Sequence, residues 1–133
     1  MRALADQSQP QPVREEAAES LAYSHYAPAI SVLIPVLDDP DVRIRFWAVF
    51  ALGGICRFRA DPRAVAALER MLGDQEVPPG NWWSVGREAL AMLAPMLPEY
   101  RVKLQVETER VRSDPDSSPD DRRWAEGYDE ANR

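Results

Sequence analysis

Three segments of the chain share one pattern of small and branched apolar residues, and this repetition limits the folds open to the chain. The segments are residues 13–22, 44–53 and 85–94, so successive copies begin 31 and 41 residues apart. The aligned positions are Val13, Ile44 and Val85, then Ala17, Ala48 and Ala89, then Leu21, Leu52 and Leu93. A spacing of four residues puts these side chains on one face of a helix. Helical repeats at such periods predict an all-α solenoid.

The residues before the second and third copies repeat as well, at a constant offset of 35 residues. Ile30, Leu33, Val36, Leu37 and Asp39 match Val65, Leu68, Met71, Leu72 and Asp74. The repeating unit is therefore a pair of helices, of which the first ends in Leu-x-Asp and the second opens on a branched residue. We expect about two and a half to three such pairs. A C-terminal capping helix at 99–112 and a flexible tail complete the predicted fold.

This pattern resembles the HEAT repeat, most closely the short bacterial type named after phycobilin lyases, over residues 13–96. The resemblance implies a ladder of ion pairs between repeats, made by the turn aspartates and the arginines that open the second helices. The residues that match this ladder are Asp39, Asp74, Arg14 and Arg45. The third copy departs from the pattern, because Gly86 stands where the other two copies have arginine.

The organisation expected is a flexible arm at 1–12, a repeat domain at 13–112 and an acidic, disordered tail at 113–133. Residues 1–12 are rich in Pro and Gln, so they cannot supply the helix that should precede the first copy. An uncapped solenoid end leaves apolar surface exposed, here at Ala18 and Leu21. Either a preceding helix lies outside this sequence, or a partner or a second copy of the chain covers that end.

The composition limits the kinds of partner that the chain is expected to bind. The formal net charge is −6, which argues against tight nucleic-acid binding, because such binding depends on cation-rich surfaces. An apolar run near 18 residues, which a membrane-spanning helix needs, is absent from the sequence. Cys56 is the single cysteine, so no disulfide forms within the chain. These features predict a bacterial cytoplasmic protein that binds a protein partner.

The sequence offers little for catalysis. One cysteine and one histidine, His25, cannot make a zinc site of the usual spacing, and a nucleophile would have only that histidine as its base. We expect no cofactor and no enzyme activity, and predict a small adaptor or an inhibitor of the immunity type. Two alternatives come from the resemblance: a chromophore-handling helper like the phycobilin lyases, and a relative of the HEAT-like alkylpurine DNA glycosylases.

The candidate binding residues lie in three places. The turn at 74–83 is about ten residues longer than the equivalent turn before it, and it ends in Asn81, Trp82 and Trp83. Long turns on a rigid scaffold often carry function, and tryptophan is a favoured interface anchor. We expect Trp82 to bind a partner and Trp83 to pack at the start of the following helix. Trp124 in the tail is a second candidate anchor, and Arg57 and Arg59 form the best site for an anionic ligand.

Overall fold

The computed structural model describes residues 8–24, 27–57 and 60–131, and within these ranges the chain is all α-helical. His25 and Arg59 lie outside the described residues. The all-α solenoid predicted from the repeats is confirmed. Short 3-10 turns at Ala27–Ala29 and Met71–Gly73 accompany the helices, which are α2 (Gln11–Ser24), α3 (Ile30–Val36), α4 (Val42–Cys56), α5 (Pro62–Arg70), α6 (Val85–Leu93), α7 (Pro98–Ser113) and α8 (Pro119–Ala131).

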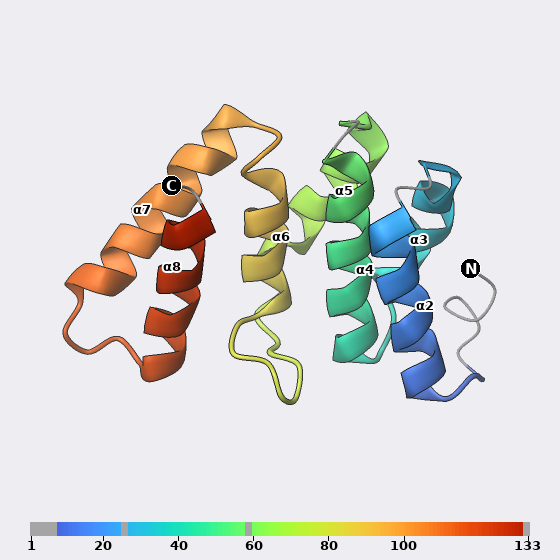
Figure 1. Cartoon of the computed structure of the whole chain (residues 1–133), viewed down its shortest axis with the longest axis horizontal. Coiled ribbons are helices and arrows are strands. Elements are labelled where there is room, and N and C mark those ends of the chain that lie inside the picture. Colours follow the sequence, from blue (N-terminus) through green and yellow to red (C-terminus); the bar gives the residue numbers. More distant parts are fainter. Residues whose placement is uncertain (1–7, 25–26, 58–59, 132–133) are drawn as a thin grey trace.

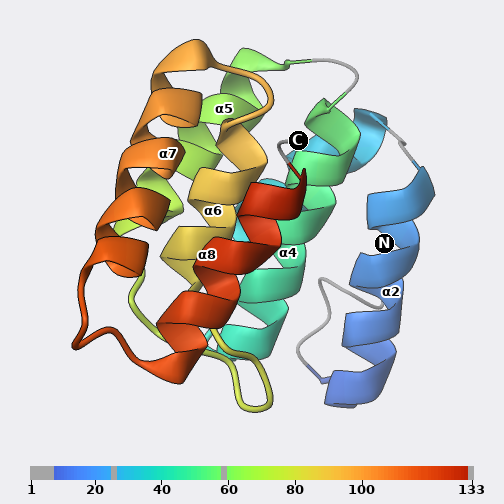
Figure 2. The same cartoon turned by 60° about the vertical axis from the view of Figure 1, so that its left-hand side comes forward.

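Helix α4 is the centre of the array. Helices α2, α4 and α6 stand side by side, and α3 and α5 pack against one side of that row (Figures 1 and 2). The side chain of Asp41 caps α4 by accepting a hydrogen bond from the backbone N–H of Arg43 at 3.0 Å. Ten of the fifteen α4 residues are buried, as expected for a helix with neighbours on several sides.

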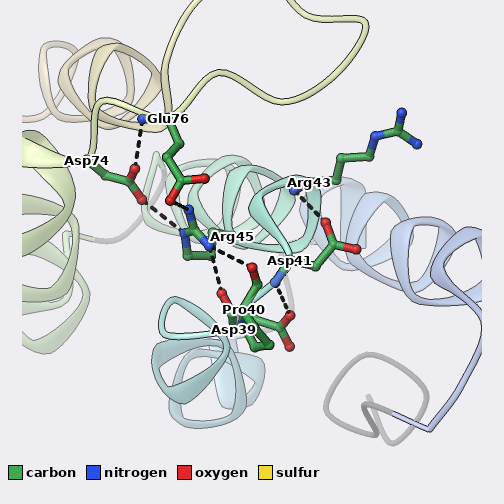
Figure 3. Close-up of polar contacts among 7 residues, drawn as sticks. All are labelled: Asp39, Pro40, Asp41, Arg43, Arg45, Asp74 and Glu76. Atoms are coloured by element: carbon green, nitrogen blue, oxygen red, sulfur yellow. Dashed lines mark hydrogen bonds and ion pairs between the residues drawn. The ribbon is translucent and has the colours of Figure 1, made fainter.

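The ladder of ion pairs predicted from the resemblance is present and mostly buried. Arg14 on α2 pairs with Asp39 in the turn before α4, and Arg45 on α4 pairs with Asp74 in the turn before α6, with Nε 3.0 Å from Oδ2. Arg45 also reaches Glu76 and donates to the backbone carbonyls of Asp39 and Pro40 (Figure 3). Each arginine therefore ties one repeat to the turn of the next.

The third repeat lacks an arginine at position 86 because the backbone of the preceding turn lies against α6 there. A Cβ on Gly86 would stand 2.5 Å from the carbonyl oxygen of Leu72 and 2.9 Å from that of Asp74. The Gly86 N–H also donates to the Asp74 carbonyl at 2.8 Å. The next residue takes over the pairing role, since Arg87 binds the carboxylate of Asp121 on α8 at 2.5 Å.

We expect Gly86→Ala to destabilise the fold by about 1–3 kcal/mol, the usual cost of overpacking, because carbonyl oxygens cannot yield without moving the whole turn. Gly127→Ala is the matched control, since no atom lies within 4 Å of its added Cβ. Alanine there should stabilise α8 by up to about 1 kcal/mol. Urea unfolding of both variants checks the pair, and a neutral Gly86→Ala would show that the turn has room to move.

The C-terminal stretch differs from its prediction. Residues 113–133 were expected to form a disordered acidic tail, but Pro119–Ala131 is helix α8, which runs back along α7 (Figure 1). Trp124 is only 1% exposed and packs among Leu90, Ala94, Leu104, Val111 and Ala125. Helix α8 docks because burial of one indole provides enough apolar contact to hold an otherwise polar helix in place.

The N-terminal end of the array also differs in part from its prediction. Helix α2 begins at Gln11, two residues before the predicted boundary of the arm. Ala18 is fully buried and Leu21 is half-buried against the core. The expectation that Ala18 would be only partly shielded is therefore wrong, because α4 covers that face of α2. Apolar surface nevertheless remains on α2, because Val13 and Tyr23 are 41% and 66% exposed.

Candidate functional site

The long turn before α6 is a defined loop. The backbone N–H of Asn81 donates to the carbonyl of Pro78 at 3.0 Å, with Pro79 and Gly80 between them. Gly80 has a φ of 84°, the backbone conformation that the third position of a type II turn requires and that glycine adopts without strain. Pro78 is fully buried at the base, so the turn holds the residues that follow it in fixed positions.

A cleft of about 490 Å³ separates this loop from the helices beside it, and we refer to it as the aromatic cleft. Helix α2 contributes Glu15, and α6 contributes Glu88. The remaining lining comes from α4 and the loop: Arg43, Phe46, Trp47, Phe50 and the six loop residues from Pro78 to Trp83. The volume falls within the range of ligand-binding pockets.

The two loop tryptophans have different roles. The indole N–H of Trp83 donates to the carboxylate of Glu88 at 2.6 Å, and its ring packs against the main core and against the residues that surround Trp124. Trp83 therefore fastens the loop to α6, as the sequence predicted. Trp82 is 46% exposed and lies beside it, with the ring centres 5.9 Å apart. An exposed, rigidly presented indole is the kind of side chain that anchors interfaces.

Sequence analysis missed the opposite wall of the cleft. Trp47 and Phe50 on α4, which were not among the candidate residues, are only half-buried and line the cleft. The rings of Trp47 and Phe50 meet edge to face with their centres 5.6 Å apart, and the ring centre of Tyr23 on α2 lies 6.1 Å from that of Phe50. Aromatic residues at positions 46, 47 and 50 recur three and four residues apart, and that spacing on one helix was the available signal.

The candidate site residues do not all gather in one place. Asn81, Trp82 and Trp83 line the aromatic cleft together. Trp124 does not line the cleft, and its burial among residues such as Leu90, Leu104 and Val111 contradicts its role as an anchor for a partner. Arg57 caps the C-terminal end of α4, about 20 Å along the helix from Arg43. Arg57 therefore lies far from the cleft, and because Arg59 lies outside the described residues, the anion site predicted at Arg57 and Arg59 stays a prediction.

Titratable groups outside the cleft serve the fold. Burial raises the pKa of the Cys56 thiol, which is fully enclosed. Partial burial by itself would raise the pKa of Asp121, but hydrogen bonds from Arg87 and Ser118 outweigh it and hold that pKa below its usual value. Among residues 8–24, 27–57 and 60–131, no group of three or more His, Cys, Asp and Glu side chains could hold a metal ion.

The helix pairs and their ladder of ion pairs define a helical-repeat protein, and comparison with known families agrees. The family model described as HEAT repeats matches residues 1–85, so the chain belongs to the HEAT-repeat family. HEAT repeats commonly mediate protein–protein interactions. No curated protein matches the chain. In the part of the chain that the structure describes, no helix is both long enough and apolar enough to cross a membrane.

Proposed function

We propose that this chain is a protein-interaction module without catalysis of its own, acting as an adaptor or an immunity-type inhibitor in a bacterial cytoplasm. The observation that carries the proposal is the aromatic cleft beside the half-exposed Trp82. Family membership supports it, because solenoid arrays present extended surfaces to protein partners.

The construction of the loop gives Trp82 the properties of an anchor. A turn with a positive-φ glycine and the Trp83–Glu88 hydrogen bond hold the backbone on either side of it. Little conformational entropy is then lost when a partner covers the indole, and pre-organisation of this kind raises affinity. The same rigidity implies that replacing Trp82 should change binding without changing the fold.

We expect Trp82→Ala to weaken the complex by at least about 2 kcal/mol, roughly 30-fold in Kd, since a central tryptophan anchor typically contributes that much. The partner is first identified by affinity capture from a bacterial lysate with quantitative mass spectrometry. Titration calorimetry with the purified partner then measures Kd for the parent and the variant.

Val77→Ala is the matched control, because Val77 is 49% exposed on the same loop and does not line the cleft. It should leave Kd within about twofold of the parent, as expected for a contact outside the anchor. Circular dichroism and the urea midpoint confirm that both variants fold. If Trp82→Ala and the parent bind the partner with equal affinity, the loop is only a structural turn.

The two alternatives predict different ligands for the same molecule. A chromophore-handling helper would bind a linear tetrapyrrole, and a DNA-binding relative would bind duplex DNA with a steep dependence on salt. No feature of the described residues favours either over a protein partner. Tetrapyrrole absorbance and duplex-binding titrations with the parent chain therefore belong in the same series of measurements.

A further inference from the structure

Helices α2 and α7 carry most of the exposed large apolar side chains that the structure describes. Six such side chains are exposed among the described residues, and four of them lie on these two helices: Val13, Tyr23, Val102 and Val106. Figure 1 shows α2 and α7 toward opposite ends of the long axis of the molecule. Single exposed apolar residues are common on protein surfaces, but their concentration at the two ends of an array is typical of surfaces that contact another molecule.

The outer face of α2 is apolar and acidic. Val13, Glu16 and Tyr23 recur at helical spacing on the face turned away from the buried Arg14. The helix has one basic and three acidic residues, and the basic one, Arg14, is already part of the ladder. Glu16 and Glu19 are exposed, and neither makes an ion pair in the part of the chain that the structure describes. These two carboxylates are therefore available to a cationic surface.

The outer face of α7 is apolar and basic. Val102 and Val106 lie one turn apart and are 57% and 59% exposed, on the side of the helix opposite the buried Leu104. Arg101 and Lys103 flank Val102, and neither makes an ion pair among residues 8–24, 27–57 and 60–131. The helix as a whole has four basic and three acidic residues. The α7 face is thus the opposite of the α2 face in charge and similar to it in apolar character.

We propose that copies of this chain associate head to tail, with the outer face of α2 in one copy packed on the outer face of α7 in the next. The valines of α7 would pack against the apolar residues of α2, and the cations that flank them would face the α2 carboxylates. None of the residues named on these two faces lines the aromatic cleft, so the contact leaves the cleft open and does not depend on the proposed function.

The charges determine which faces meet. Burial of apolar side chains favours contact between any two of these faces. A contact between two α2 faces would bring carboxylates together, and a contact between two α7 faces would bring cations together, and both arrangements are unfavourable. Contact of α2 with α7 joins opposite charges. Because the two faces differ, the contact is heterologous and each assembly keeps a free face at both ends.

The first test is sedimentation equilibrium of the full chain. We expect the weight-average mass to rise above that of the monomer between about 10 μM and 1 mM, the range in which small interfaces dissociate. Over the same range, the backbone amide signals of α2 and α7 should shift together in ¹H–¹⁵N spectra.

Two charge-reversed variants identify the surfaces. Glu16→Lys with Glu19→Lys puts cations on α2, and Arg101→Glu with Lys103→Glu puts carboxylates on α7. Each double variant alone should associate at least about tenfold more weakly than the parent, because like charges then meet in the contact. A mixture of the two should associate within about threefold of the parent, because opposite charges meet again at every contact between unlike copies. All four positions are exposed, so circular dichroism should show the helix content of the parent.

Three results would overturn the proposal. The first is a parent chain that stays monomeric over the whole concentration range. The second is a double variant that associates as tightly as the parent, which would indicate a contact between like faces or through another surface. The third is a mixture that associates no better than its two components.

Discussion

Replacing Asp39 with alanine is expected to lower the free energy of unfolding by about 3–5 kcal/mol. Asp39 pairs with Arg14, and their side chains are only 2% and 6% exposed. Its other carboxylate oxygen accepts the backbone N–H of Asp41 at 2.9 Å, at the start of the central helix. The variant removes the carboxylate that balances the buried Arg14 charge, and breaking a buried pair from one side carries a cost of this size.

The neighbouring residue provides the control. Asp38, in the same turn, pairs with Arg70 on α5 of the following repeat at 3.3 Å, but these side chains are 68% and 51% exposed. Exposed pairs contribute about 0–1 kcal/mol because water and salt screen them, so Asp38→Ala should barely move the urea midpoint. The double variant Arg14→Met with Asp39→Asn should recover most of the loss, since it removes both charges and keeps the cap on Asp41. Similar losses for Asp38→Ala and Asp39→Ala would contradict the buried ladder.

Leu52→Ala is expected to destabilise the fold by about 2–5 kcal/mol, the usual range for a buried leucine. Leu52 is fully buried on α4, the helix between α2 and α6. A cavity there lies among residues of neighbouring repeats, which cannot all move inward to fill it. Equilibrium urea unfolding, monitored by helical circular dichroism, measures the change.

Val106→Ala is the comparison for Leu52→Ala, because Val106 on α7 is 59% exposed. Its effect should stay within about 0.5 kcal/mol, as is usual for surface substitutions. If Leu52→Ala moved the midpoint no further than Val106→Ala, α4 would not be the centre of the core.

The periodic part of the fold was predictable because its causes are local. Apolar residues spaced three and four apart define helix faces, and the recurring Leu-x-Asp turns indicate where one helix of a pair ends. The ladder was inferred from the family resemblance, and its two arginines and two aspartates were named correctly. Helix α7 was also predicted, although its exposed Val102 and Val106 alternate like residues of a strand.

The docking of the C-terminal helix was not predictable in the same way. Its composition is polar and acidic, and it docks through Trp124 against clustered residues of α6 and α7. Arg87, displaced by one position from the ladder, both stacks on that indole and pairs with Asp121. The local sequence around Trp124 does not indicate that its indole packs among apolar residues and stacks against a cation.

The sequence by itself determined the repeat architecture and the place of Trp82 on a long loop, and the ladder came from the family resemblance. Only the tertiary structure decided that this loop faces α4 across a cleft, that Trp47 and Phe50 form the opposite wall, and that Trp124 is part of the core. The physical reason is the range of the interactions. Helix periodicity acts within a few residues, whereas the cleft depends on side chains that α2, α4, α6 and the loop at 78–83 bring together.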